Sequence, residues 1–154
     1  AGKPMIIVVN KWDAVEKDEH TMVEFEEKVR NEFAYLSYAP ILFVSAKTRQ
    51  RVDTNIPEVD RVFENSTRRV STNILNEVIA DSQITTPAPA RNGKRFRIYY
   101  ATQVAIQPPT FVLSCNEPKL MHFTYQRFIE NTLRRAFDFE GTPIHIIARK
   151  KVSE

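Results

Sequence analysis

Glycine is so scarce in this chain that several ligand-binding folds are excluded at once. The 154 residues include three glycines, Gly2, Gly93 and Gly141. A phosphate-binding P-loop needs two glycines at fixed spacing before Lys-Ser/Thr, because only glycine lets the backbone close around phosphate. Gly2-Lys3 is followed by Pro4, so the chain carries no such loop. The three-glycine dinucleotide fingerprint and the Gly-x-x-Gly nucleic-acid clamp are excluded by the same count.

The first half of the chain alternates buried strands with amphipathic helices. Residues 5–9 form a continuous apolar run, rich in β-branched residues, that is typical of a strand buried on both faces. Residues 41–44 are apolar as well and are expected to form a second buried strand. Between them, apolar residues at spacings of three and four predict a helix over residues 17–35. Two further helices are predicted over residues 56–65 and 71–81. This strand-helix-strand-helix order predicts an α/β fold.

The second half follows a different pattern, which predicts an α+β unit in the order α-β-β-α-β with a three-stranded sheet. Its strands are expected at residues 95–104, 110–115 and 144–148. A long helix is expected at residues 120–139, and Gly141 is placed to end it. Residues 81–94 contain two prolines and an Asn-Gly step, and they are expected to form an irregular connector.

The first strand of this unit has a period-two pattern that predicts one apolar and one polar face. The apolar face would carry Phe96, Ile98, Tyr100 and Val104. The polar face would carry Arg95, Arg97 and Gln103. We therefore expect a half-exposed strand.

Charge divides the chain near residue 66. Residues 1–66 hold nine Lys and Arg against twelve Asp and Glu, a formal charge of −3, whereas residues 67–154 hold thirteen against seven, a charge of +6. This asymmetry predicts two units, 1–66 and 67–154, and makes the second a candidate for RNA binding. Its candidate RNA contacts are Arg91, Lys94, Arg95, Arg97, Arg149, Lys150 and Lys151. The alternative is that these side chains form only a solvated basic face.

Other features favour structural roles. No apolar run approaches the roughly 18 residues of a membrane helix, and the single cysteine cannot form an internal disulfide, so we expect no membrane partner and a cytoplasmic location. The histidines lack a second ligand at metal spacing, so no metal site is predicted. His20, His122 and His145 are expected to have structural or surface roles, and Cys115 is expected to be a small buried residue. Arg127, Arg134 and Arg135 are expected to form a solvated face of the long helix.

Two short loops have the chemistry to recognise a guanine base. In Asn10-Lys11-Trp12-Asp13, which follows the first buried strand, the Asp13 carboxylate can accept hydrogen bonds from both the ring N–H and the exocyclic amine of guanine. Adenine offers no such pair and would leave the carboxylate unpaired. Lys11 would lie along the base, and Asn10 would tie the loop to neighbouring backbone. The alternative is a helix-capping loop with Asp13 as the acceptor.

The second loop follows the next parallel strand. Ser45-Ala46-Lys47 can present the Ala46 backbone N–H to the guanine O6 atom. Because open α/β sheets bind ligands at the carboxyl ends of their strands, both loops are expected at one site. Two such signals in this order favour guanine recognition.

Several strings resemble the Der (EngA) family of bacterial GTPases, which have two tandem Era-like G domains followed by a KH-like domain. The resemblance covers essentially the whole chain and is carried by residues 8–13, 44–46, 68–72, 87–89, 98–103 and 139–144. The most specific strings are Tyr-Tyr-Ala-Thr-Gln at 99–103 and Phe-Glu-Gly-Thr-Pro at 139–143. The resemblance implies that residues 1–66 are the carboxyl-terminal part of the second GTPase domain and that residues 67–154 are the KH-like domain. It also implies a role in assembling the large ribosomal subunit.

The resemblance also implies binding of GTP or GDP. It places base contacts at Asn10, Lys11 and Asp13, with Trp12 inside the motif, and at Ser45, Ala46 and Lys47. The phosphate loop, both switch regions and the Mg²⁺-side motif of such a GTPase would lie upstream of Ala1, so this chain is expected to be inactive in hydrolysis alone. Arg49-Gln50-Arg51 stands where relatives often carry glycine, which makes this loop more basic.

Two readings of the KH-like domain follow. It could contact ribosomal RNA, as its charge suggests, but without a Gly-x-x-Gly clamp it would have to use another surface. Alternatively, it is an interaction module that docks on the first G domain and does not bind RNA.

Overall fold

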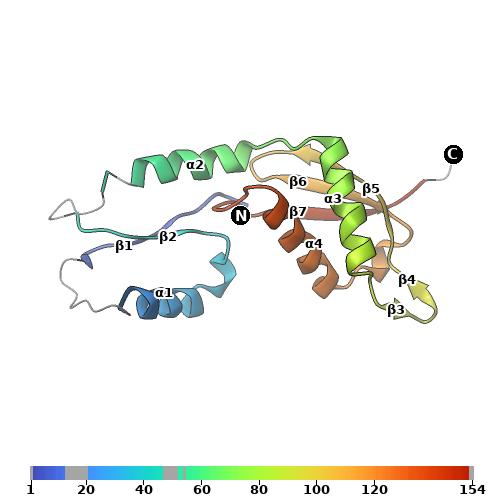
Figure 1. Ribbon diagram of the computed structural model, residues 1–154, viewed down its shortest axis with the longest axis horizontal. Helices are drawn as coiled ribbons and strands as arrows, with labels where there is room; N and C mark the ends of the chain where they lie inside the picture. The colour runs from blue at the N-terminus through green and yellow to red at the C-terminus, as the bar shows by residue number, and fades with distance from the viewer. Residues whose placement is uncertain (1, 13–20, 47–51, 54, 153–154) are drawn as a thin grey trace.

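A computed structural model describes residues 2–12, 21–46, 52–53 and 55–152 and shows an elongated chain with two lobes (Figure 1). In the first lobe, the short strands β1 (Ile7–Val9) and β2 (Ile41–Phe43) pair in parallel. Between them lie helix α1 (Thr21–Glu32) and the 3₁₀ turn η2 (Ala34–Leu36), and helix α2 (Asn55–Thr67) follows β2. The described residues thus keep the predicted strand-helix-strand-helix order, while residues 17–20 of the predicted helix lie outside them. The expectation that the first strand is buried on both faces is wrong, because Val8 in the middle of β1 is 52% exposed.

An aromatic cluster holds the first lobe together. The Trp12 ring is 2% exposed and packs edge-on against Phe25 and tilted against Phe43, with centroid distances of 5.4 and 4.6 Å. The backbone N–H of Trp12 donates to the backbone carbonyl of Val44 (3.0 Å), which extends the β1–β2 contact beyond the strands. Trp12 therefore fixes the loop after β1 against α1 and β2.

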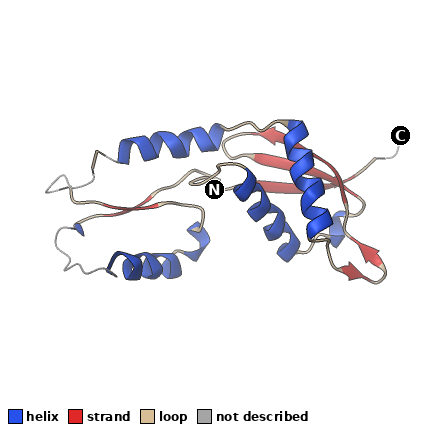
Figure 2. Cartoon of the chain, in the orientation of Figure 1, coloured by secondary structure: helices blue, strands red, loops and turns tan. Residues whose placement is uncertain are grey.

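The second lobe contains helix α3 (Thr72–Thr85), a small hairpin of β3 (Ala90–Arg91) and β4 (Lys94–Arg95), then β5 (Ile98–Ala105), β6 (Thr110–Cys115), the 3₁₀ turn η3 (Pro118–Leu120), helix α4 (Phe123–Ala136) and β7 (His145–Lys150). Its main sheet has the order β5-β6-β7, with β5 and β6 antiparallel and β6 and β7 parallel (Figure 2). The predicted α-β-β-α-β order and three-stranded sheet are confirmed, with the hairpin added between α3 and β5.

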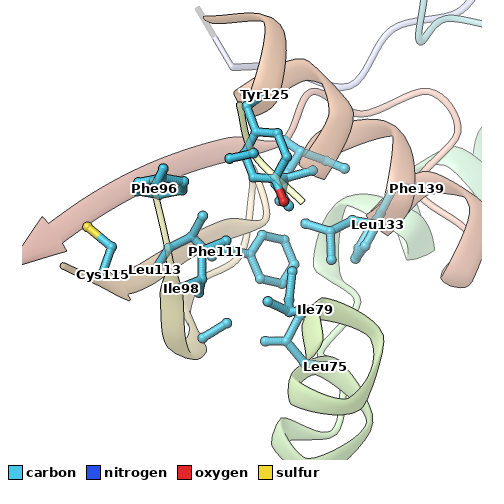
Figure 3. Packing of buried hydrophobic residues seen from close by; sticks show 14 residues of the cluster. Leu75, Ile79, Phe96, Ile98, Phe111, Leu113, Cys115, Tyr125, Leu133 and Phe139 are labelled. Carbon is cyan, nitrogen blue, oxygen red and sulfur yellow. The ribbon is translucent and has the colours of Figure 1, made fainter. Parts of the chain in front are cut away.

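The core of this lobe lies between the sheet and both helices (Figure 3). Leu75 and Ile79 of α3 meet Ile129 and Leu133 of α4 over one face of the sheet. From that face, Ile98, Ala101, Phe111, Leu113 and Cys115 project into the same cluster. Since α3 and α4 share this face, neither covers the opposite one, which we call the open face of the sheet.

The prediction that residues 81–94 form an irregular connector is wrong. Helix α3 continues to Thr85, and β3 and β4 form an antiparallel hairpin whose loop is Asn92-Gly93. Both loop residues have positive φ, +50° and +73°, as a two-residue hairpin turn requires. The Asn-Gly step therefore marks a tight hairpin turn.

The predicted alternation in β5 is also wrong beyond Ile98. The pairing shifts between Ile98 and Tyr100, so Tyr99 is an extra residue in a β-bulge, and it shifts again before Ala105. A bulge inserts one residue and reverses the side-chain alternation that follows it. As a result Tyr100 and Val104 are about half exposed, while Ala101 is fully buried.

Gly141 does not end α4. The helix ends at Ala136, where the Phe137 N–H donates to the Leu133 carbonyl (2.9 Å). Gly141 belongs to residues 138–143, which we call the junction loop because it contacts the first lobe. Its N–H donates to the Tyr38 carbonyl (2.6 Å), and its carbonyl accepts from the Met5 N–H (2.7 Å).

Helix α2 forms the other side of this junction. The Asn65 side chain, fully buried, donates to the Asp138 carboxylate and to the Glu140 carbonyl, both at 3.0 Å. The Arg61 guanidinium forms ion pairs with Asp138 (3.2 Å) and Glu140 (2.8 Å). The hydrogen bond to Glu140, with the neighbouring carboxylates, raises the pKa of Arg61 above its ordinary value.

The expectation that Arg134 lies on a solvated face is wrong. Its guanidinium donates to the carbonyls of Phe139 (3.0 Å) and Thr142 (2.9 Å) and lies 5.7 Å from the Tyr38 ring centroid. A guanidinium satisfies several acceptors at fixed angles, so Arg134 shapes the junction loop from within. The polar side of α4 thus contributes to the contact between the lobes.

Candidate functional site

The two loops with guanine chemistry lie side by side at the carboxyl ends of β1 and β2. The Asn10 Oδ1 atom accepts two hydrogen bonds from backbone N–H groups. One comes from Lys11 in the same loop (2.8 Å) and the other from Ala46 in the second loop (3.1 Å). One amide oxygen therefore joins both loops. A guanine O6 atom at Ala46 would share this N–H in a three-centre bond.

Lys11 has an unusual backbone conformation. Its φ is +58°, in the left-handed region that non-glycine residues rarely adopt, and its side chain is exposed. Such conformations cost roughly 1–3 kcal/mol and concentrate at functional sites, where the surrounding contacts enforce them. Here Asn10 holds the Lys11 N–H on one side, and buried Trp12 anchors the chain on the other.

The structure separates the roles of the predicted site residues. Asn10, Lys11 and Ala46 are exposed at the strand ends, whereas Trp12 and Ser45 are buried beneath them. The Trp12 ring is enclosed by aromatic neighbours, so it supports the loop from below. The predictions for Asp13 and Lys47 fall outside the described residues.

The seven candidate RNA contacts are distributed over the hairpin, the start of β5 and the end of β7. Arg91, Lys94 and Arg95 belong to the β3–β4 hairpin, whereas Arg97, Arg149 and Lys151 gather around β5 and the end of β7. Lys150 pairs in register with core residue Cys115 and so alternates to the other side of the sheet from Arg149. Each of these basic side chains is exposed.

Tyr99 is the centre of the second basic group. The Arg97 guanidinium carbon lies 5.5 Å from the centroid of its ring, and the Lys151 ammonium lies 5.3 Å from it. Both distances fall within the range of a cation–π interaction. Gln103, which was expected beside them, instead accepts from the Val70 N–H (2.9 Å) and donates to the Arg68 carbonyl (2.8 Å).

Asn116 positions the backbone of this group. Its N–H donates to the Arg97 carbonyl (3.1 Å), its Oδ1 accepts from the Arg97 N–H (3.0 Å), and its Nδ2 donates to the Arg95 carbonyl (2.7 Å). These bonds hold the link between β4 and β5 against the end of β6. Sequence patterns did not single out Asn116, because a lone polar residue after a strand gives no sign of its partners.

An open groove of about 750 Å³ runs between the carboxyl-terminal half of α3 and the start of β5. Its lining includes Gln83, Ile84, Pro87, Arg95, Arg97 and Tyr99. Two amide side chains of α3, two helical turns apart, contact the backbone of β5. Gln83 bonds to the N–H and the carbonyl of Ile98, and Asn76 bonds to the N–H and the carbonyl of Ala101. These side chains therefore satisfy backbone hydrogen-bonding groups along the outer edge of β5.

Other polar groups have structural roles. His122 caps α4 by accepting from the Thr124 N–H at Nδ1 (3.3 Å). Cys115 is fully buried, its thiol donates to the Arg149 carbonyl (3.3 Å), and burial raises the thiol's pKa. Within the described ranges, no three His, Cys, Asp or Glu side chains come together to hold a metal ion. None of the described helices has the length and hydropathy to cross a membrane.

Comparison with known proteins gives consistent matches. The family described as "KH-domain-like of EngA bacterial GTPase enzymes, C-terminal" matches residues 69–149. The chain is 60% identical to GTPase Der of Lacticaseibacillus casei and 61% identical to GTPase Der of Geobacillus thermodenitrificans, in each case over 151 residues. It is 56% identical to GTPase Der of Bacillus thuringiensis. Each alignment covers 98% of this chain but 35% of the relative, so the chain spans about a third of their length.

Proposed function

Because the chain belongs to the EngA (Der) family of bacterial GTPases and contains its carboxyl-terminal KH-like domain, we propose that it is the part of a GTP- and GDP-binding protein that joins guanine recognition to RNA contact. In this proposal residues 1–66 are the carboxyl-terminal part of the second GTPase domain. Residues 67–154 contact RNA of the large ribosomal subunit during its assembly in the cytoplasm.

The observation that carries the guanine site is the double hydrogen bond of Asn10. It places the loop after β1 and the Ala46 N–H within one hydrogen-bonded unit, at the end of the sheet where open α/β folds bind ligands. Asp13 would accept from the ring N–H and amine of guanine, and Ala46 would donate to O6. Lys11 and Lys47 would cover the base.

The phosphates of the nucleotide need a different set of groups. A glycine loop and Mg²⁺ position the phosphates and the attacking water in such enzymes, and the three glycines of this sequence lie outside any such motif. The chain's own contribution is therefore to bind and orient the base. Without phosphate contacts its affinity for nucleotide should be weak, and it should not hydrolyse GTP.

The test compares GDP, IDP and ADP by ligand-observed NMR with the 154-residue chain. IDP lacks the exocyclic amine, so binding should fall from GDP to IDP and again to ADP as each donor to Asp13 is removed. Asn10→Ala should weaken GDP binding because it separates the two loops, whereas Asn31→Ala on the exposed side of α1 should not. Equal binding of GDP and ADP would argue against the guanine site.

A second candidate function is docking of the KH-like domain on the first G domain of the intact protein. It is favoured by exposed apolar side chains on the sheet, such as Ile147 and Val104. Charge reversal at Arg95 and Arg97 distinguishes the two functions. RNA contacts weaken steeply with salt, whereas an apolar docking surface does not.

A further inference from the structure

The β-bulge in β5 places two tyrosines together at one end of the sheet. Ile98 pairs with Cys115 and Tyr100 with Ser114, so Tyr99 is the additional residue between them. Tyr99 and Tyr100 are 47% and 49% exposed. Bulges often re-aim a side chain in this way beside a functional surface.

Register shows which side of the sheet Tyr100 occupies. Tyr100, Ser114 and Arg149 are paired across the three strands, and they alternate with Ala101 and Leu113, which are fully buried in the core. Residues paired in register share a face, so Tyr100 and Arg149 lie on the open face. Lys151 follows Arg149 by two residues and is therefore on the same side.

Three basic side chains lie near this tyrosine pair. Arg97 and Lys151 lie over the Tyr99 ring, at 5.5 and 5.3 Å from its centroid, and Arg149 is in register with Tyr100. One acidic residue, Glu77 of α3, lies along the same hollow as Tyr99 and Tyr100, on the side toward α3. Glu117 uses its carboxylate to accept from the Lys119 N–H at the start of η3. We call Arg97, Tyr99, Tyr100, Arg149 and Lys151 the tyrosine face.

The backbone beside the tyrosine face is closed to one common mode of peptide binding. A peptide that adds a strand to β5 needs the free N–H and carbonyl groups of its edge. At Ile98 and Ala101 these groups bond to Gln83 and Asn76, at 2.7–3.0 Å. A partner at this end of the sheet must therefore be recognised by side chains.

From this geometry we propose that the tyrosine face binds single-stranded RNA, with bases stacked on Tyr99 and Tyr100 and phosphates held by Arg97, Arg149 and Lys151. The inference rests on the proposed RNA contact and assigns it a surface and a substrate class. Exposed aromatic rings flanked by cations suit splayed bases, since every base has a stacking face and every linkage a charge. On binding, Arg97 and Lys151 would exchange the Tyr99 ring for phosphate oxygens.

The test measures anisotropy of a fluorescein-labelled uridine RNA of about 12 nucleotides with the 154-residue chain at several salt concentrations. Tyr99→Ala should weaken binding about 10-fold at every salt concentration, as expected for one lost stacking contact, whereas Tyr99→Phe should keep nearly full affinity. Lys151→Gln should lower the slope of log K against log salt by about 0.7, as expected for one lost phosphate contact.

Matched controls come from elsewhere on the surface. Tyr35→Ala removes a ring that is 72% exposed on the first lobe, and Arg127→Gln removes an exposed charge on α4; neither should change affinity by more than about 2-fold. Circular dichroism checks that each variant is folded. Tyr100→Ala supplies a second test of stacking in case Tyr99→Ala unfolds.

The outcomes separate this inference from the proposed function. If the wild-type chain binds RNA and the tyrosine variants bind equally well, the tyrosine face is not the site, although RNA contact itself stands. If RNA affinity falls on removing the charge of Lys151 but not on removing the rings of Tyr99 and Tyr100, base stacking on the tyrosines is refuted. If the wild-type chain binds neither this RNA nor large-subunit ribosomal RNA, the RNA part of the proposed function fails as well.

Discussion

Gly141 is packed so closely against α2 that it has no room for even a methyl group. A Cβ atom at this position would lie 2.4 and 2.6 Å from the two Cγ atoms of Val62, closer than carbon atoms approach in proteins. Its φ of +85° is also unfavourable for any other residue. Gly141→Ala should therefore destabilise the chain through both backbone strain and overpacking.

Gly93 separates these two effects. It has a similar φ of +73°, but nothing lies within 4 Å of the Cβ that would be added. The backbone cost is about 1 kcal/mol at either position. Overpacking in a buried site adds about 1–3 kcal/mol. Gly141→Ala should thus lower the free energy of unfolding by about 2–4 kcal/mol, against about 1 kcal/mol for Gly93→Ala.

Urea and thermal denaturation followed by circular dichroism measure the difference. For a chain of this size, each 1 kcal/mol lowers Tm by about 2–4 °C. Val62→Ala removes both Cγ atoms, so in a double-mutant cycle it should recover part of the overpacking cost of Gly141→Ala. The reasoning is refuted if Gly141→Ala costs no more than Gly93→Ala, or if Val62→Ala gives no recovery.

Two further predictions rest on hydrogen bonds and a third on the burial of Cys115. Arg134→Met leaves two carbonyls of the junction loop unpaired and should cost about 2–3 kcal/mol in urea denaturation, with Arg135→Met as the control. Asn76→Ala exposes the Ala101 edge of β5 and should cost about 1–3 kcal/mol and increase self-association in sedimentation. Burial raises the pKa of Cys115, so iodoacetamide should label it at pH 8 only after denaturant is added; rapid labelling of the folded chain would contradict this.

Local periodicity was sufficient to predict the elements that bury one apolar face. Ile129 and Leu133 of α4 recur at helical spacing and are fully buried, and β6 has the predicted bounds, Thr110–Cys115. The bulge at Tyr99 could not be predicted in this way, because it depends on which β6 residue pairs with which β5 residue. The hairpin at Asn92 carried its own signal, since Asn-Gly favours a two-residue turn.

The same distinction applies to the polar residues, including those of the candidate site: placement by strand order was predictable, and contacts that depend on the tertiary fold were not. That Asn10 and Ala46 lie together could be predicted, because parallel strands bring their carboxyl ends to one edge. The partners of Arg134 and Gln103 could not, because pattern analysis assigns polar residues to solvent. Only the fold brings backbone carbonyls within their reach. The guanine contacts and the boundary at residue 66 stay predictions.

The two lobes have separate apolar centres and a largely polar junction. The first centre forms around Trp12, Phe25 and Phe43, while the second draws every residue of its core from beyond residue 69. Between them, Arg61 and Asn65 are fixed by ion pairs and hydrogen bonds to the junction loop. Hydrogen bonds with narrow angular limits hold one relative orientation more strictly than apolar packing does. Because α2 follows the Ser45–Lys47 loop and also holds the junction, the candidate guanine site and the KH-like sheet belong to one connected structure.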